Sequence, residues 1–297
     1  MHYKRYKTIL SPKNGLNLYR GCTHGCIYCD SRSACYQMDH AFEDIQVKED
    51  AIAILREQLV KKRRPCMIST GAMTDPYLHL EEKLRLTRQS LELVEELGFG
   101  VALLTKSDRV LQDLDLLQRI NEKTKAVVQI TLTTMDDALC RKIEPRVSVT
   151  SQRLQVLAEC QKRKIPTVVW LGPLLPFLTD SEENVEALLA ACHKVGVKGI
   201  VNFGFGVTMR EGNREYFYRQ LDRLFPGMKE RYIRVFGNRY ECTSPANQKL
   251  MDLYHRRCEA YGILHHNHEV FAYLQEFEVK GEAEAEQLSL FYPREPL

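Results

Sequence analysis

The chain has 297 residues, of which 44% are hydrophobic and 27% charged, and its formal net charge at pH 7 is +3. This length and apolar content suffice for a large buried core, and no apolar run approaches the ~20 residues that cross a bilayer. The first ten residues lack the pattern of a secretory signal, so we expect a soluble, cytoplasmic protein whose cysteines are reduced. The small net charge neither demands nor excludes a nucleic-acid partner.

Short apolar runs alternate with longer amphipathic stretches along most of the chain. The runs predict strands at 16–20, 65–71, 99–105, 126–132, 166–171 and 198–203. The stretches between them predict helices, for example over 48–62, 80–97, 108–121, 151–163 and 182–195. Such alternation with right-handed crossovers gives a parallel sheet, so the fold class is α/β, with activity expected at the C-terminal ends of the strands.

Three cysteines directly follow the first predicted strand. Cys22, Cys26 and Cys29 have the spacing C-x3-C-x2-C, which is one ligand short of a closed zinc site or an electron-carrying iron–sulfur site. A [4Fe-4S] cluster on three thiolates would leave one iron open to a small molecule. A zinc site that recruits His24 or Cys35, or thiols that are simply buried, are the alternatives.

Polar residues follow the second, third and fourth predicted strands. After the second strand come a glycine, which lets a ligand approach the backbone, and groups that can hydrogen-bond an ammonium ion: Ser69, Thr70, Gly71, Thr74 and Asp75. Lys106 follows the third strand beside a helix start, and Thr133 follows the fourth. Helix capping is the alternative for Thr74 and Asp108. Glu144, Arg146 and Arg210 also follow strands and are candidates for substrate contacts or for surface positions.

The cysteine spacing, with Tyr28 before the last cysteine, resembles the radical S-adenosylmethionine (SAM) superfamily. The segments NLYRGCTHGCIYC, TGAMTDPY, LTKSDRVLQDLDLL and IEPRVS together resemble its spore photoproduct lyase-like group, often labelled DNA repair photolyases, over about residues 15–240. The resemblance implies a partial (β/α)6 TIM-type barrel in residues 1–210. It also implies that the three cysteines hold a [4Fe-4S] cluster, that SAM binds the open iron, and that an electron donor such as flavodoxin or ferredoxin reduces it. Cleavage of SAM then gives a 5'-deoxyadenosyl radical.

Carried over residue by residue, the resemblance also implies roles for single positions. The backbone around Tyr28 would contact adenine, Thr74 and Thr133 match SAM-contacting positions, and Lys106 would pair with the SAM carboxylate. The lyase has a hydrogen-donating cysteine just before the position of Thr74, where this chain has Ala72 and Met73. Neither can replace a thiol, so repair of spore photoproduct is not expected. The substitute hydrogen donors to inspect are Cys35, Tyr77, Tyr240 and Cys242, with Cys66 expected in the core.

The last third of the chain is predicted to be an α-rich extension, residues 211–279, that covers the open side of the barrel. Its segment 229–240 mixes basic and aromatic residues, which suits phosphates and bases but also an ordinary amphipathic surface. His265, His266 and His268 stand without a nearby acid or cysteine pattern, so we do not assign them to a site.

Residues 280–297 are predicted to form a flexible tail. It contains the motif Gln287, Leu288, Ser289, Leu290, Phe291, which resembles the peptide that binds the bacterial sliding clamp through its last two apolar residues. The alternative is that the tail covers the protein's own barrel.

We therefore expect a radical SAM enzyme that abstracts hydrogen from an unknown substrate, with nucleic acid as the preferred class. One alternative is modification of a small molecule, a peptide or a protein. Another is a non-enzymatic iron–sulfur or zinc adaptor that the tail recruits to the clamp.

Overall fold

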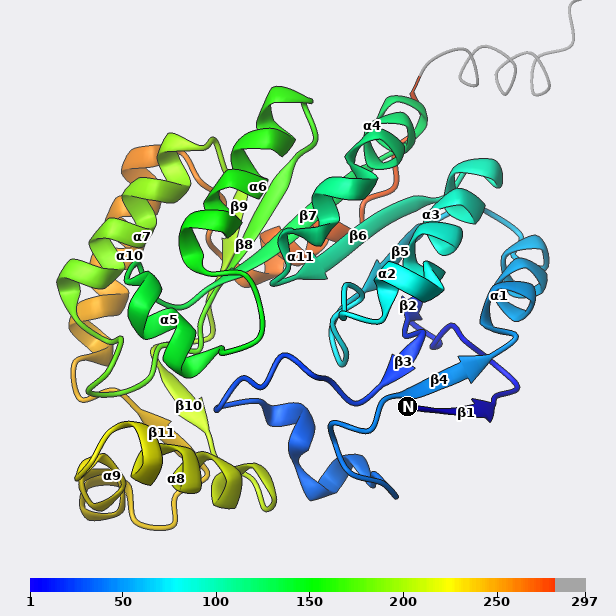
Figure 1. Cartoon of the computed structure of the whole chain (residues 1–297). Helices are drawn as coiled ribbons and strands as arrows, with labels where there is room; N and C mark the ends of the chain where they lie inside the picture. Colours follow the sequence, from blue (N-terminus) through cyan, green and yellow to red (C-terminus); the bar gives the residue numbers. More distant parts are fainter. Residues whose placement is uncertain (281–297) are drawn as a thin grey trace, which may run out of the picture.

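A six-stranded parallel sheet forms the centre of the computed structural model, which describes residues 1–280 (Figure 1). Its strands, in spatial order, are β2 Gly15–Leu16, β5 Met67–Thr70, β6 Gly100–Thr105, β7 Ala126–Leu132, β8 Thr167–Leu171 and β9 Gly199–Val201. Every neighbouring pair is parallel. The spatial order follows the chain order, as successive crossovers of one hand require. The predicted α/β fold with a partial barrel is thereby confirmed.

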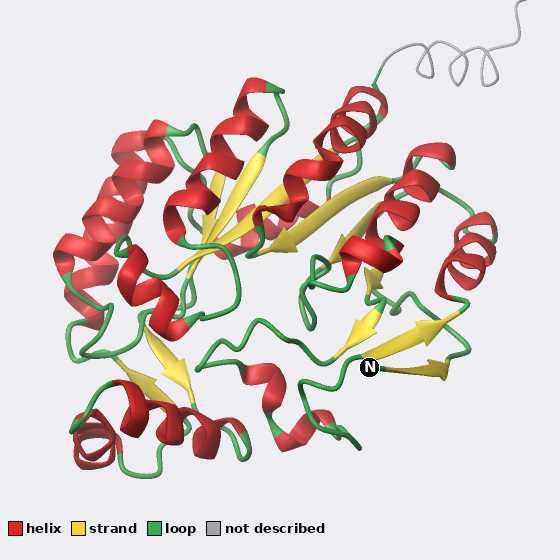
Figure 2. Cartoon of the chain, in the orientation of Figure 1, coloured by secondary structure: helices red, strands yellow, loops and turns green. Residues whose placement is uncertain are grey.

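Helices cover the outer face of this sheet (Figure 2). They are α1 Ala51–Val60, α3 Leu86–Glu96, α4 Leu114–Lys123, α6 Thr150–Lys162 and α7 Glu182–Lys194, with α10 Asn247–Tyr261 packed against α7. Outward-facing strand residues such as Leu103 and Val169 join Leu117, Leu157 and Leu188 of the helices in one buried cluster. Because successive strand residues point to opposite faces, the remaining residues face the barrel interior.

One helix of the C-terminal part lies against this inner face. Met67, Val127 and Val168, near the starts of their strands, contact Val270 and Leu274 of α11 Asn267–Gln275. The barrel interior is therefore closed at the N-terminal ends of its strands, and the opposite end carries the loops that follow the strands.

The structure corrects several predicted boundaries. The first predicted strand divides between β2 and β3 Tyr19–Arg20, and β3 belongs to a separate three-stranded sheet with β1 His2–Arg5 and β4 Gln46–Glu49. The helix predicted from residue 48 therefore begins at α1. The helix predicted over 80–97 is broken at Arg85, whose φ of 50° separates α2 Glu81–Leu84 from α3, and the one predicted from residue 108 starts as a 3-10 helix, η3 Asp108–Asp113.

The extension does not form one continuous cover. β10 Gly206–Thr208 and β11 Glu241–Thr243 pair antiparallel, and α8 Asn213–Leu224 and α9 Met228–Phe236 lie between them in the chain. Residues of this unit, including Phe217 and Tyr232, pack with Ile27 and Tyr28 of the cysteine loop. In Figure 1 this unit lies below the main sheet, next to the segment that contains the short 3-10 helices η1 Asp30–Arg32 and η2 Ala34–Tyr36. The domain boundaries stay a prediction.

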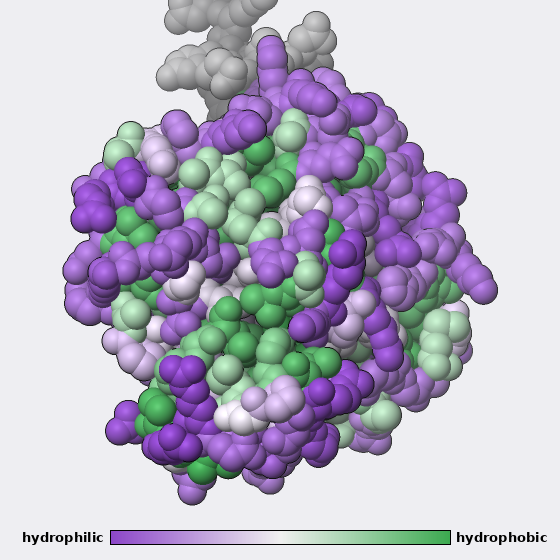
Figure 3. All heavy atoms as spheres, turned by 60° about the vertical axis from the view of Figure 1, so that its left-hand side comes forward, coloured by the Kyte–Doolittle hydropathy of each residue, from purple (hydrophilic) through white to green (hydrophobic). Residues whose placement is uncertain are grey.

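Within residues 1–280, no helix is both long and apolar enough to cross a membrane. The space-filling view shows hydrophobic residues gathered in the middle of one face, with hydrophilic residues around them (Figure 3). The predicted clamp-binding motif, 287–291, lies outside the described residues.

Candidate functional site

The cysteine loop, residues 21–29, follows β3 and depends on glycine for its path. Gly21 and Gly25 have φ values of 88° and 75°, a region that favours glycine. A Cβ on Gly21 would lie 2.5 Å from the Phe42 carbonyl oxygen, and one on Gly25 would lie 3.2 Å from the Pro145 ring. The glycines beside Cys22 and Cys26 thus let the loop approach its neighbours closely.

The loop is held by residues 143–146, which follow α5 Asp137–Ile143. The Ile27 N–H donates to the Ile143 carbonyl at 2.9 Å, and the Arg146 N–H donates to the His24 carbonyl at 3.1 Å. The Tyr28 hydroxyl donates to the Glu144 carboxylate. The segment IEPR is therefore the support of the cysteine loop.

Glu144 lies at the centre of a buried charge network. It and Arg153 of α6 are both 0% exposed and form an ion pair at 2.7 Å. Arg153 also donates to the Ser148 and Thr131 carbonyls at 2.8 and 3.0 Å. Glu144 is thus not available to contact a substrate, which corrects that expectation. Sequence reasoning missed Arg153, because an arginine in an amphipathic helix carries no local sign that it is buried.

Cys22 and Cys26 have an environment that suits a bound cation. Burial, and then the neighbouring Cys29, raises the pKa of Cys22 to about 12. Burial and the charge of Glu144 raise the pKa of Cys26 well above its usual range. Such thiols are protonated in the free protein, and a soft metal centre is what converts buried thiols to thiolates.

The spacing of the thiols distinguishes a cluster from a single ion. In a tetrahedral zinc site with bonds of about 2.3 Å, thiolate sulfurs lie about 3.8 Å apart. The ligand atoms of two other groups of described residues lie within 4.8 Å of one another, but the three cysteine sulfurs do not. The Cys35 sulfur accepts a hydrogen bond from Arg210, and Nδ1 of His24 lies 3.6 Å from Asp75, while its buried Nε2 has no hydrogen-bond partner. The donor set therefore fits a cluster better than zinc.

Asp75 connects the loops after β5 and β6. Its carboxylate accepts hydrogen bonds from the Thr105 hydroxyl at 2.7 Å, the Lys106 N–H at 2.8 Å and the Tyr77 N–H at 2.9 Å. The His24 ring nitrogen Nδ1 lies 3.6 Å from the same carboxylate. Asp75 thus positions the cysteine loop and two strand ends relative to one another.

Lys106 is a buried cation that interacts with Cys26, Glu144 and Asp75. Burial by itself would lower the pKa of its ammonium, but the Glu144 carboxylate and an ionised Cys26, the form that a bound metal centre requires, raise that pKa above its usual value. Lys106 therefore stays protonated. Thr133 lies beside the same network, where its hydroxyl donates to Glu144 at 3.3 Å.

The alternation of the strand separates two predicted SAM contacts. Thr70 lines a small cavity in the outer layer with Leu91 and Val94 of α3. Ser69, one residue earlier, therefore faces the barrel interior. The Thr70 side chain therefore faces away from the barrel interior, and a contact of Thr70 with SAM stays a prediction that would use its backbone.

The four candidate hydrogen donors fall into two pairs. Tyr77 is 0% exposed and donates to Asp113 at 2.9 Å, and Cys242 is 0% exposed within an apolar cluster. Both are core residues, so the structure speaks against them as donors. Cys35 and Tyr240 are exposed, and Arg210 joins them: Nη1 donates to the Cys35 sulfur at 3.2 Å and Nη2 to the Tyr240 hydroxyl at 2.8 Å.

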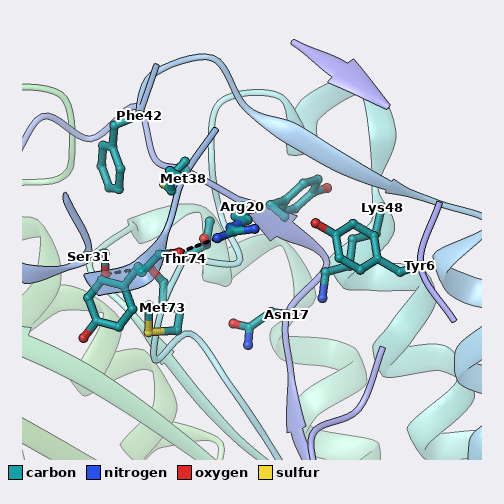
Figure 4. Close-up of a pocket in the computed structure, with 12 residues that line it drawn as sticks. Tyr6, Asn17, Arg20, Ser31, Met38, Phe42, Lys48, Met73 and Thr74 are labelled. Atoms are coloured by element: carbon teal, nitrogen blue, oxygen red, sulfur yellow. Dashed lines mark hydrogen bonds between the residues drawn. The ribbon is translucent and has the colours of Figure 1, made fainter. Parts of the chain in front are cut away.

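A pocket of about 260 Å³ opens beside the cysteine loop (Figure 4). Its lining includes Arg20 and Lys48, the Tyr6 and Phe42 rings, and Thr74, but no acidic residue of the described chain. Burial and the nearby Arg20 lower the pKa of the Lys48 ammonium. Two cations without an acidic partner in the lining favour an anionic ligand.

The pocket is also lined by Met73, one of the two residues, with Ala72, that stand where the resemblance implies a cysteine in the lyase. Figure 4 shows Ser31 and Met73 side by side, and the Ser31 hydroxyl donates to the Met73 carbonyl at 3.0 Å. Sequence reasoning missed Tyr6 and Lys48, because the sheet that carries them, β1–β4–β3, was not predicted.

Comparisons with known proteins agree with this geometry. The profile of the radical SAM superfamily matches residues 16–190. An uncharacterized protein of Mycobacterium tuberculosis is 29% identical over 230 residues, which are 74% of this chain and 66% of that protein, slightly under two thirds of its length. A radical SAM Nα-GlyT isomerase of Pseudomonas phage M6 is 25% identical over 162 residues, which cover 54% of this chain and 33% of the isomerase.

The solved structures show the same fold. Spore photoproduct lyase with bound AdoMet and dinucleoside spore photoproduct superposes with a TM-score of 0.58 and 15% identity, covering 84% of this chain and 74% of the lyase. The superfamily implies SAM and a [4Fe-4S] cluster as cofactors, and its reactions are SAM-dependent radical reactions. Because the family profile matches more than half of the chain, with Cys22, Cys26 and Cys29 inside the matched range, this protein belongs to the radical SAM superfamily.

Proposed function

We propose that the protein binds a [4Fe-4S] cluster through Cys22, Cys26 and Cys29 and abstracts a hydrogen atom from a nucleic-acid substrate. The three thiolates would hold the cluster, which would pass one electron from a donor such as flavodoxin or ferredoxin to SAM and so allow its cleavage to methionine and a 5'-deoxyadenosyl radical. The observation that carries the proposal is the set of three thiols in one supported loop, with a charged Lys106 close to Cys26.

The residues around the loop would bind and orient SAM. Lys106 stays protonated and can pair with the methionine carboxylate, while Asp75 holds the Lys106 backbone in place. The Tyr28 hydroxyl is occupied by Glu144, so a contact of Tyr28 with adenine would use its backbone. Thr74 lies at the pocket wall, where it would contact SAM.

The pocket supports nucleic acid as the substrate class. Aromatic rings stack on bases, and cations neutralise phosphates. Arg20 is held by donating to the carbonyls of Tyr36 and Gln37, and Lys48 has no acidic partner within 4.0 Å among the described residues. An anionic small molecule or peptide would use the same two charges, so the substrate class needs its own test.

Cys35 and Tyr240 are the proposed hydrogen donors. Both are exposed and share Arg210, whose Nε lies 3.5 Å from Asp30. Arg210 would hold the two side chains together, and either one can give a hydrogen atom to a substrate radical.

The first test is SAM cleavage. The protein is reconstituted with iron and sulfide without oxygen, reduced with SAM and assayed for 5'-deoxyadenosine. We expect product from the native chain and from Cys66→Ala, a matched thiol outside the loop, and none from the triple variant of Cys22, Cys26 and Cys29 to Ala. A colourless protein that retains zinc and leaves SAM intact contradicts the proposal.

A second test addresses the substrate class. Binding of a single-stranded oligonucleotide is measured over a range of salt concentrations for the native chain, Lys48→Met and the exposed control Lys61→Met. Loss of one phosphate contact should lower the salt slope by about one in Lys48→Met only. Binding that is insensitive to salt and to Lys48 favours a small-molecule substrate instead.

A further inference from the structure

Three histidines meet where α10 is followed by the segment that leads to α11. His255 lies on α10, and His265 and His266 precede α11; one ring nitrogen from each lies within 4.8 Å of the others. The ring centroids of His265 are 5.2 Å from His255 and 4.4 Å from His266. Imidazole nitrogens in such a group are typical ligands of divalent transition metals.

The orientation of His265 is the second observation. Its Nδ1 lies 3.0 Å from the Ile263 carbonyl oxygen, which can only accept, so Nδ1 carries the proton. Its Nε2 is buried and has no hydrogen-bond partner. Metal-binding histidines show this arrangement, because a hydrogen bond at one nitrogen fixes the ring and leaves the other nitrogen free to coordinate.

A second group of ligand-type residues in the same molecule differs in composition, because it contains a carboxylate. His2, His40 and Asp44 also lie within 4.8 Å of one another. There, Asp44 is engaged by the N-terminal ammonium at 2.6 Å and by His2 at 2.9 Å, and the second nitrogen of His2 lies 2.9 Å from the Gln46 amide. The carboxylate of that group is therefore already paired, although the buried Nε2 of His40 also has no hydrogen-bond partner.

The histidines lie where the C-terminal part of the chain pairs with the edge of the main sheet, so a bound ion would stabilise this junction. Leu264 forms a parallel bridge with Gly199 of β9, and the Ile200 N–H donates to the Leu264 carbonyl at 2.8 Å. The Tyr254 hydroxyl lies 3.0 Å from the carbonyls of both Ile200 and His265. Residues around Leu264 thus extend the main sheet past β9, and the chain then enters α11 inside the barrel.

We propose that His255, His265 and His266 bind a divalent transition-metal ion of the zinc class, which links α10 to the open edge of the barrel. Water or His268, whose ring lies 6.0 Å from that of His266, completes the coordination. The site is structural and separate from the cysteine loop, so it does not depend on the proposed reaction.

Metal binding tests the proposal directly. The full chain, without a polyhistidine tag and with the three loop cysteines occupied by reconstitution, is titrated with zinc against a competing chelator. His266→Ala is the main variant, because His266 precedes α11 without a side-chain capping bond. His255→Gln is the second. His193→Ala is the matched control, since the His193 ring stacks on Tyr261 of α10 at 4.2 Å but lies outside the group.

We expect one bound zinc ion in the native chain and in the control, and an affinity lower by at least about tenfold in both variants. Zinc should raise the thermal midpoint of the native chain and the control only, and Co²⁺ should give a visible absorption band that both variants lose. Iron content and SAM cleavage should be equal in all four proteins, so a failure of the cluster proposal would be seen separately. Equal zinc affinity in all four proteins, or no bound zinc in the native chain, overturns the proposal.

Discussion

Two acidic side chains set the charge around the cysteine loop. Glu144 balances Arg153 and receives the Tyr28 hydroxyl, whereas Asp75 ties Lys106 to the loop after β5. A buried charge without its partner is costly, so single substitutions at these positions should reveal how the site is held.

Replacing Glu144 with Gln leaves the fully buried Arg153 without a counter-charge. We expect a loss of about 3–5 kcal/mol in the free energy of unfolding, measured with urea. The matched control is Glu159→Gln, because the pair of Glu159 with Lys162 on the same α6 helix is largely exposed; it should cost less than about 1 kcal/mol. Similar losses in both variants would show that the buried pair is not a determinant of stability.

The raised pKa of the buried Glu81 carboxyl predicts that the free energy of unfolding depends on pH. Burial raises its pKa to about 7, while an unfolded Glu titrates near about 4.3. Between these values the folded chain keeps a proton that the unfolded chain has lost, so stability is full below about pH 4 and falls as the pH rises towards 7, by roughly 3 kcal/mol.

Glu81→Gln should remove this dependence. Urea unfolding at pH 5 and pH 7.5 is compared for the native chain, Glu81→Gln and the exposed neighbour Glu82→Gln. A native chain that loses no more stability than Glu81→Gln between these pH values is incompatible with a raised pKa.

At the scale of the elements, the backbone just after β5 lies very close to β6, at the start of the loop that leads to the proposed site. Gly71 has a φ of 97°, and a Cβ there would lie 1.8 Å from the Leu104 carbonyl oxygen. The loop that carries Thr74 and Asp75 therefore starts from a contact that only glycine permits.

Gly71→Ala should displace this loop and abolish SAM binding, measured by equilibrium dialysis on reconstituted protein. Gly98→Ala is the matched control, because Gly98 also has a positive φ, 68°, but no atom would lie within 4 Å of its Cβ. Its cost should be about 1–2 kcal/mol, from the left-handed backbone alone. If both variants bind SAM equally, the close approach does not shape the site.

In the molecule as a whole, the C-terminal part supports both ends of the barrel. α11 fills the interior at the starts of the strands, and the unit of α8 and α9 packs on the cysteine loop. The α-rich extension is therefore part of the framework of the proposed site, and Arg210 before α8 supplies the link between Cys35 and Tyr240.

The tail motif is expected to act independently of this framework. We propose that residues 287–291 bind the bacterial sliding clamp. The double variant Leu290→Ala and Phe291→Ala should lose binding to purified clamp in fluorescence anisotropy, with unchanged formation of 5'-deoxyadenosine, because the motif is separated from the barrel by a charged segment. Glu284→Gln is the control. Loss of SAM cleavage together with clamp binding would instead support a tail that covers its own barrel.

Local pattern was sufficient for the features that repeat or cluster along the chain. β7 matches its predicted range at Ala126–Leu132, and α6 and α7 match theirs within a residue, because a buried strand or an amphipathic helix is encoded in adjacent residues. The cysteine motif spans only eight residues, so the resemblance to the superfamily could be recognised from adjacent residues in the same way.

Tertiary structure alone decided which distant side chains meet. The partner of Tyr19 in β3 is Val47 in β4, the partner of Glu144 is Arg153, and Arg210 brings Cys35 to Tyr240. The register of β5 decided which of Ser69 and Thr70 faces the barrel interior. His255 lies near His265 because the chain turns back after α10. Periodicity and spacing report the burial of one segment, whereas contacts between segments depend on how the whole chain packs, and no local pattern contains that information.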